Sequence, residues 1–169
     1  VYNGTDAVML SGETTTGDYV VETVDAMAKI AEHIEESIVY KNIFADKQVE
    51  TPTDAIIKAV AEAANSLKTK LIVIPTISGS SARLISNLEP SCPILALVKD
   101  EETANQLALN YGVYAKVVDT QKDMDSLVEL SIKEAKEFMD LKTGDNIIVT
   151  GGLVAGKIGF TNLMKIETI

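Results

Sequence analysis

Four hydroxyl side chains and a glycine lie within one six-residue segment: Thr76, Ile77, Ser78, Gly79, Ser80 and Ser81. An apolar strand pattern precedes the segment and a helical pattern follows it, which places the hydroxyls at the N-terminus of a helix. Unpaired N–H groups there, together with the helix dipole, bind anions without formal positive charge. The segment is therefore a candidate phosphate-binding turn. The alternative is that Ser78 or Ser80 only caps the helix.

A second glycine-rich segment, residues 151–159, follows another strand pattern and contains Gly156, Lys157, Ile158 and Gly159. Glycines allow a backbone to approach a ligand closely and to move. The segment is therefore a candidate binding loop. The alternative is a long turn before an edge strand, in which Lys157 is simply solvated.

Other reactive side chains lack the neighbours that catalysis or metal binding requires. The single histidine, His33, excludes a histidine metal cluster and is expected to be a solvated helical residue. The single cysteine, Cys92, excludes an internal disulfide and is expected to be an inert, partly buried thiol. Ser11 has no nearby His or Lys to activate it as a nucleophile. The sequence contains no Walker loop, dinucleotide-binding fingerprint or Cys/His metal spacing.

Charge and hydropathy restrict the class of partner. A formal net charge of −10 argues against nucleic acid, whose phosphates require a basic surface. Any anionic ligand must be held by local geometry against an unfavourable overall field. Hydrophobic residues make up 46% of the chain without a long uninterrupted apolar run, which argues against a membrane protein and favours a cytoplasmic one.

The periodicity divides the chain near residues 40–52. Apolar positions recur at helical spacing over residues 18–40, which predicts an amphipathic helix. Residues 41–50 show no period and are interpreted as a connector. Thr51, Pro52 and Asp54 then form a helix start, with a capping residue, a first-turn proline and an acid at capping-box spacing.

From that start, helices and apolar strands alternate. The helices are predicted at residues 53–67, 80–88, 101–110 and 123–141, and the strands at 71–74, 94–98, 115–118 and 146–150. Continuous apolar strands between helices predict a mostly parallel sheet covered on both faces. A final strand at 163–169 follows without a helix and should be antiparallel. The predicted fold is a three-layer α/β/α sandwich with a five-stranded sheet.

The N-terminal segment looks like the end of a larger fold. Residues 7–10 form an apolar strand pattern, followed by a turn at Ser11 and Gly12 and a second turn at Gly17 and Asp18 before the long helix. This pattern is typical of a strand–helix unit entered in mid-strand. We expect a fragment of a longer chain, in which residues 1–17 are extended or paired with another chain because a solitary strand has no partner.

Three segments resemble pyruvate kinase. Residues 7–19, AVMLSGETTTGDY, are similar to the family's eighth barrel strand and following turn, with departures at Thr15, Thr16 and Val20. The segment IVIPTISGSSARLISNLEPSCPILAL resembles the phosphate loop and the strand after it, and GFTNLMKI resembles the closing strand. Nearly the whole chain is covered by the resemblance.

The resemblance implies a bacterial-type pyruvate kinase, which transfers a phosphoryl group from phosphoenolpyruvate to ADP in glycolysis, uses Mg and K, and forms a homotetramer. Residues 1–40 would be the last strand and helix of the catalytic (β/α)8 barrel, residues 41–52 a connector, and residues 53–169 the C-terminal regulatory domain. The family's catalytic Lys and metal-binding acids lie in earlier barrel strands, so we expect this chain alone to be inactive. The alternative is a free-standing ligand-binding or scaffold domain.

The resemblance also assigns roles to both candidate loops. Thr76, Ser78, Gly79, Ser80 and Ser81 would hold a phosphate of an allosteric sugar-phosphate effector, and residues 156–159 would form the effector loop. Ser80 stands where many relatives have Arg or Lys, and Leu127 lies near the position of an Arg that binds a second phosphate. Because charge-assisted contacts are about twice as strong as neutral ones, a monophosphate effector is favoured. Lys157 replaces the usual acid and would supply the counter-charge from across the cleft.

Overall fold

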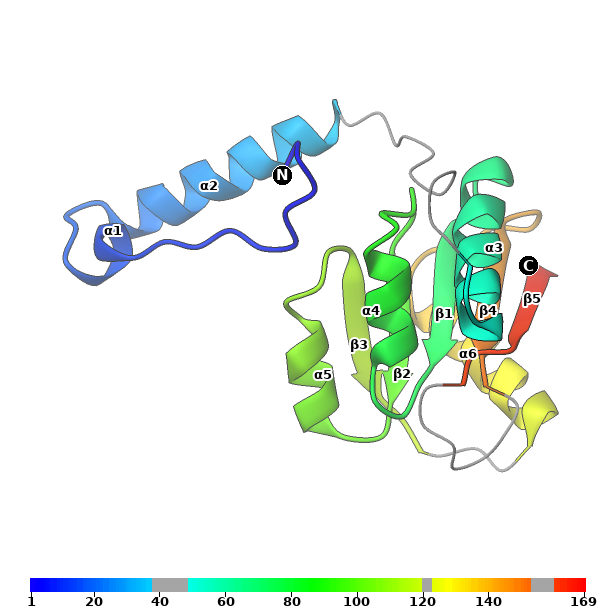
Figure 1. Cartoon of the computed structure of the whole chain (residues 1–169). Helices are drawn as coiled ribbons and strands as arrows, with labels where there is room; N and C mark the ends of the chain where they lie inside the picture. Colours follow the sequence, from blue (N-terminus) through cyan, green and yellow to red (C-terminus); the bar gives the residue numbers. More distant parts are fainter. Residues whose placement is uncertain (38–48, 120–122, 153–159) are drawn as a thin grey trace. The chain divides into compact units, whose positions relative to one another are not determined.

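The computed structural model describes residues 1–37, 49–119, 123–152 and 160–169. The chain divides into two compact units, Val1–Lys41 and Asn42–Ile169. The second unit contains the sheet, and its helices and strands are shown in Figure 1. Each unit is described by itself below.

The second unit is built on a five-stranded sheet in the order β3-β2-β1-β4-β5. Its strands are β1 (Leu71–Pro75), β2 (Ile94–Val98), β3 (Val113–Val117), β4 (Asn146–Gly151) and β5 (Leu163–Thr168). β1 pairs in parallel with β2 and β4, and β2 pairs in parallel with β3. β5 pairs antiparallel with β4, as the sequence predicts.

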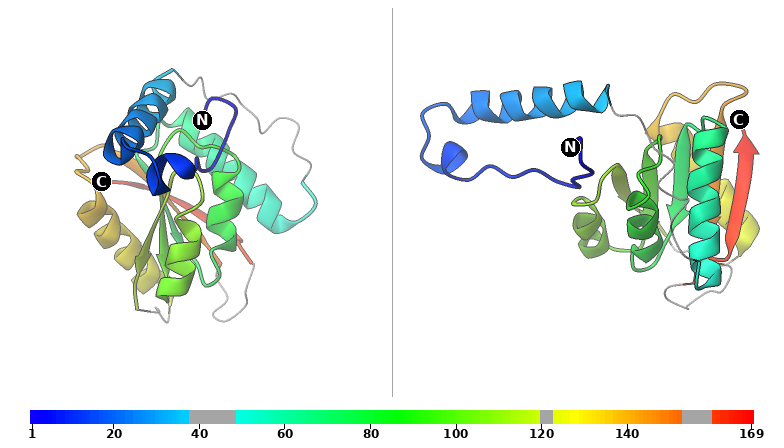
Figure 2. Two further views of the ribbon diagram at one scale, coloured as in Figure 1. Left: turned by 90° about the vertical axis from the view of Figure 1, so that its left-hand side faces the viewer. Right: turned by 45° about the horizontal axis from the view of Figure 1, so that its top comes forward.

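Helices cover both faces of this sheet. One face packs against α3 (Pro52–Ser66), α4 (Ser80–Ser86) and α5 (Glu101–Leu107), and the other packs against α6 (Met124–Phe138). Figure 2 shows the three helices on one side and α6 on the other. Side chains alternate along β1, so that Ile72 and Ile74 enter the first core cluster and Leu71 and Val73 the second. The predicted α/β/α sandwich is confirmed.

Three of these helices begin at a polar side chain. Thr51 and Asp54 form a reciprocal capping box at the start of α3. Asp100 accepts a hydrogen bond from Thr103 N at 2.8 Å before α5, and Asp123 accepts one from Ser126 N at 2.9 Å before α6. Each cap satisfies a backbone donor that has no partner inside its helix.

Several predicted boundaries shift by one to three residues; α4 ends at Ser86 rather than 88, and α5 at Leu107 rather than 110. β3 begins at Val113 rather than 115 because Val113 pairs with Ile94 and is only 8% exposed. α6 ends at Phe138 rather than 141, since Met139 adopts an extended conformation with φ −149° and ψ 157°.

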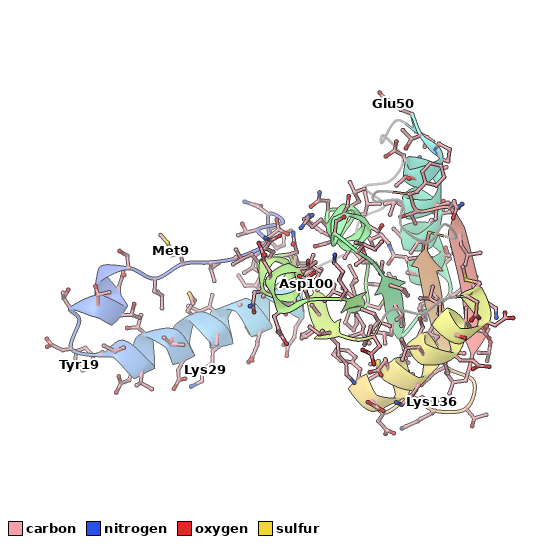
Figure 3. The ribbon with its side chains drawn as sticks, turned by 90° about the horizontal axis from the view of Figure 1, so that it is seen from below. Met9, Tyr19, Lys29, Glu50, Asp100 and Lys136 are labelled. Atoms are coloured by element: carbon pink, nitrogen blue, oxygen red, sulfur yellow. The ribbon has the colours of Figure 1, made fainter. Side chains whose placement is uncertain are left out.

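The first unit contains two helices, α1 (Gly12–Thr15) and α2 (Val20–Glu35), and neither buries a residue. The strand pattern at residues 7–10 forms no strand here, and Met9 is 85% exposed. Figure 3 shows Met9 and Tyr19 with their side chains directed away from their own backbone. A strand needs a paired neighbour, and the described part of this unit offers none. Residues 38–40 of the predicted long helix lie outside the described residues.

Among the helices that the structure describes, none has the length and apolar character needed to cross a membrane.

Candidate functional site

The turn between β1 and α4 lies at the carboxyl end of the central strand of the parallel sheet. Thr76 N donates to Leu97 O at 2.9 Å, which continues the pairing with β2 by one residue. Gly79 N then donates to the hydroxyl of Thr76 at 3.1 Å. The turn is therefore closed by one of its own hydroxyls. Ligands of doubly wound sheets bind at this end of the strands.

Gly79 is the N-cap of α4 and has the left-handed conformation, with φ 72°. A Cβ atom at this position would lie 2.9 Å from the Leu107 side chain of α5. The position therefore requires glycine both for its backbone conformation and for space. This finding replaces the interpretation in which Ser78 or Ser80 caps the helix.

The N-terminus of α4 has no side-chain cap. Its first helical hydrogen bond runs from Arg83 N to Gly79 O at 3.0 Å, so the amides of Ser80, Ser81 and Ala82 precede the ladder. Among the described helices of the second unit, α4 alone begins in this way. Amides at a helix N-terminus can bind an anion; here Ser80 is half-buried, and Ser81 and Ala82 are buried.

The hydroxyls of the turn divide into two groups. Ser78 and Ser80 are half-buried, and their side chains form no hydrogen bond to another described residue. Ser81 is 9% exposed, and its hydroxyl is hydrogen-bonded to that of Thr161. Thr161 N donates in turn to the Thr53 hydroxyl at 3.3 Å. Ser81 therefore ties the turn to a segment 80 positions later, through a bond in which either hydroxyl can be the donor.

Arg83 is the functional residue that the sequence reasoning missed. Its guanidinium donates to Ser78 O at 2.8 Å, which holds a cation against the turn. It is the only arginine in the sequence and lies four residues after Gly79. That spacing, one helical turn from the glycine, was the available signal.

The second candidate loop lies largely outside the described residues, including Gly156, Lys157, Ile158 and Gly159. Its two ends are described and lie close together. Asn162 N donates to Gly151 O at 3.1 Å, and a Cβ on Gly152 would meet Phe160 O. Because Thr161 contacts Ser81, the end of this loop is anchored beside the β1–α4 turn.

The start of α6 carries acids and no cation in its first turn. Asp123 caps the helix, and Asp125 lies in its first turn. Hydrogen bonds from Ser126 hold the pKa of Asp123 below its ordinary value, so the carboxylate stays charged. Leu127 is half-buried and offers no charge.

The remaining reactive groups behave as structural ones. Burial raises the pKa of Cys92 to about 12, which confirms an inert thiol. His33 is exposed, and its Nδ1 atom lies 3.8 Å from Oε2 of Glu36. Ser11 N donates to Glu13, and hydrogen bonds from the Glu13 and Ser11 amides lower the pKa of Glu13. No group of three or more metal-ligating side chains occurs in the described ranges.

Comparison with known proteins gives one family match. The model of "Pyruvate kinase, alpha/beta domain" matches residues 54–167. These bounds enclose the sandwich from the first turn of α3 to the end of β5.

Curated relatives match along the whole chain. A pyruvate kinase of Sporosarcina psychrophila is 38% identical over 172 residues, covering all of this chain and 29% of the relative. One from Staphylococcus saprophyticus is 42% identical with the same coverage. One from Clostridium perfringens is 37% identical over 174 residues, covering all of this chain and 37% of the relative. The chain thus spans between 29% and 37% of the length of these relatives.

Proposed function

This chain belongs to the pyruvate kinase alpha/beta domain family, and we propose that it is the regulatory part of a pyruvate kinase that binds a phosphorylated effector at the β1–α4 turn. The whole enzyme would transfer a phosphoryl group from phosphoenolpyruvate to ADP in cytoplasmic glycolysis. The remainder of a longer chain would carry the catalytic residues. This chain would contribute the effector site and a subunit contact in a homotetramer.

The main observation that supports this proposal is that no side chain caps the start of α4. α3, α5 and α6 each have a side-chain acceptor at the N-terminus, whereas α4 has a glycine in the left-handed conformation. The amides of Ser80, Ser81 and Ala82 and the half-buried hydroxyls of Ser78 and Ser80 are the groups that we propose for the phosphate. In a chain of net charge −10, such local donors are what can hold a phosphate.

The charges around the turn favour a monophosphate. Ser80 supplies a hydroxyl instead of a cation, and the first turn of α6 contains acids. Arg83 is the single nearby cation on α4, and it already donates to Ser78 O. A second phosphate would therefore lack a charge-assisted partner among the described residues. Lys157, which lies outside the described residues, is proposed as the counter-charge from the second loop.

Magnesium and potassium are the cations expected for the full-length enzyme. The described residues contain no group of three or more His, Cys, Asp or Glu side chains that could hold a metal ion. The effector proposal depends on no metal ion.

The first unit is proposed to be the last strand and helix of the catalytic barrel, comprising residues 1–40 and joined by 41–52 to the domain at 53–169. The exposed apolar side chains of α2 support this assignment, since Val21 and Val24, one helical turn apart, are 68% and 45% exposed. A helix with an apolar stripe of this kind is stable when it packs against another element.

Calorimetric titration tests the effector site. The ligands are AMP, ribose 5-phosphate, glucose 6-phosphate and fructose 1,6-bisphosphate, each added to this chain and to the full-length enzyme. We expect a monophosphate to bind more tightly than the bisphosphate. Preference for the bisphosphate would refute the monophosphate proposal, and no binding to the folded full-length enzyme would refute the site.

A matched pair of variants locates the binding. Ser80→Asp puts a like charge among the α4 amides and should weaken binding at least tenfold, by roughly the cost of juxtaposed like charges. An acid in the first helical turn favours the helix, so the fold should be kept. Ser80→Ala removes only the hydroxyl and should weaken binding about two- to tenfold. Equal affinities for both variants would place the anion elsewhere.

A coupled assay tests the catalytic assignment separately. With phosphoenolpyruvate, ADP and magnesium, this chain alone should show no turnover above a mock purification. Clear turnover would contradict the proposal that the catalytic residues lie in the remainder of the enzyme.

A further inference from the structure

β3 is an edge strand with one side of its backbone unpaired. It lies at the end of the sheet order and pairs only with β2 among the described strands. Ile94 N donates to Gly112 O, and Val118 N donates to Val98 O. The backbone groups of the even-numbered residues of this segment therefore form the hydrogen bonds to β2. Alternate residues of a parallel strand direct N–H and C=O to opposite sides. Ala115 and Val117 therefore direct theirs toward the open edge.

A groove of about 770 Å³ runs along this edge. Ala104 and Ala108 line it on the α5 side, and their small side chains leave room beside the strand. Tyr114 and Phe138 line it on the α6 side, with ring centroids 5.2 Å apart and exposed fractions of 54% and 36%. In Figure 3, Asp100 marks the start of α5 and Lys136 marks α6. The groove thus combines an open strand edge with apolar walls.

The charge of the groove identifies its occupant. Its lining includes three carboxylates, Glu101, Glu134 and Glu137, and one ammonium group, Lys116. Lys116 is paired with Glu134 and with Glu137, the latter at 2.9 Å. Lysines on edge strands normally discourage pairing with other chains. Here the ammonium is held against α6 by two acids, one of which, Glu137, also pairs with Lys133 at 3.8 Å. Glu101 forms no ion pair with a described residue, so one carboxylate of the lining keeps its negative charge uncompensated.

We propose that the groove along β3 is a docking site for an extended peptide with basic side chains, which adds a strand to β3. The peptide backbone would form hydrogen bonds with the backbone of Ala115 and Val117. Alternate lysine or arginine side chains of the peptide would lie near the carboxylates that line the groove. A second copy of this chain fits poorly, because it would bring the same three carboxylates to the edge in a protein of net charge −10.

Fluorescence anisotropy with a defined probe tests this site. The probe is fluorescein-labelled Lys-Val-Lys-Val-Lys-Val-amide, added to the full 169-residue chain at about 0.15 M salt. We expect saturable binding with a Kd below about 1 mM. The Glu-for-Lys peptide and a peptide N-methylated at alternate amides should bind at least about tenfold more weakly.

Variants locate the peptide on β3. Val117→Pro removes an outward N–H without removing a bond to β2, and should weaken binding about tenfold. Glu101→Gln should weaken it about threefold, whereas Glu102→Gln, in the same turn of α5 but outside the groove, should leave it unchanged. If Val117→Pro does not fold, hydrogen exchange of the wild type decides instead, with slower exchange of the Ala115 and Val117 amides expected when the probe is added.

Three results would overturn the proposal. They are no binding of the probe, equal binding of the N-methylated peptide, and exchange protection that leaves Ala115 and Val117 unchanged. Self-association of the chain that Val117→Pro abolishes would show instead that the occupant is a second copy.

Discussion

The β1–α4 and β2–α5 turns leave neighbouring parallel strands and lead into helices of seven residues each. α5 begins at Asp100, whose carboxylate accepts from Thr103 N, and its first turn carries Glu101 and Glu102. α4 begins at Gly79 and has no acid in its first turn. We call the β2–α5 turn closed, because a carboxylate of its own caps the helix, and the β1–α4 turn open, because no side chain caps the helix. The two turns occupy equivalent places in the topology, and we propose that the cap residue decides which of them binds a ligand.

The largest expected effect comes from changing the glycine that opens α4. Gly79→Ala introduces a Cβ at positive φ and 2.9 Å from Leu107, and should lower the free energy of unfolding by about 2 to 4 kcal/mol. Gly112→Ala is the matched control, since Gly112 has φ 67° with nothing within 4 Å of a Cβ. It should cost about 1 to 2 kcal/mol. Urea denaturation measures both, and equal costs would show that Leu107 does not limit the turn.

A smaller effect is expected from the cation of the open turn. Arg83→Gln removes the charge that lies against Ser78, and should weaken binding of ribose 5-phosphate about three- to tenfold in calorimetry. Lys99→Gln removes an exposed cation from the closed β2–α5 turn and should leave the affinity unchanged. Similar losses in both variants would mean that overall charge, and not the position of Arg83, governs binding.

Acid should remove the stability that the Asp100 cap gives to the closed turn, whereas the open turn has no such cap to lose. The backbone hydrogen bond from Thr103, followed by the side-chain bond from the same residue, lowers the pKa of Asp100 below its ordinary 3.8. A group with a lowered pKa stabilises the fold above its unfolded pKa, and this contribution is lost as pH falls through the folded pKa. The advantage of wild type over Asp100→Asn in unfolding free energy should therefore shrink below pH 3.8.

Replacement of the hydroxyls in the open turn provides the control for that measurement. Ser78→Ala should show the same acid dependence as wild type, because Ser78 does not titrate. A difference between wild type and Asp100→Asn that stays constant as pH falls below 3.8 would show that the carboxylate charge does not stabilise α5.

Patterns among residues that are close in sequence were sufficient to predict most of the fold. The capping box at Thr51 and Asp54 places the start of α3, and the continuous apolar runs place β1, β2 and β4, because both patterns depend on near neighbours in sequence. The strand pattern at residues 7–10 shows the limit of this reasoning. Its spacing is that of a strand, yet a strand requires a paired neighbour, which the described part of the first unit does not contain.

The candidate site was predictable in composition but not in detail. The hydroxyl-rich turn is evident from the sequence, but neither the left-handed conformation of Gly79 nor the closeness of Leu107 of α5 to its Cβ position is. The bond between Ser81 and Thr161 joins residues 80 positions apart, which no local pattern reveals. Ser81 therefore fixes the turn to a distant segment, and its role in phosphate binding stays a prediction.

Amide chemical shifts during a titration with ribose 5-phosphate test the central claim most directly. In a ¹H–¹⁵N spectrum of the 169-residue chain, the amides of Ser80, Ser81 and Ala82 should move in a saturable way. The amides of Glu101, Glu102 and Thr103, at the closed start of α5, should stay in place. Equal movement at both helices, or movement at neither, would contradict the proposal that the uncapped N-terminus of α4 binds the effector phosphate.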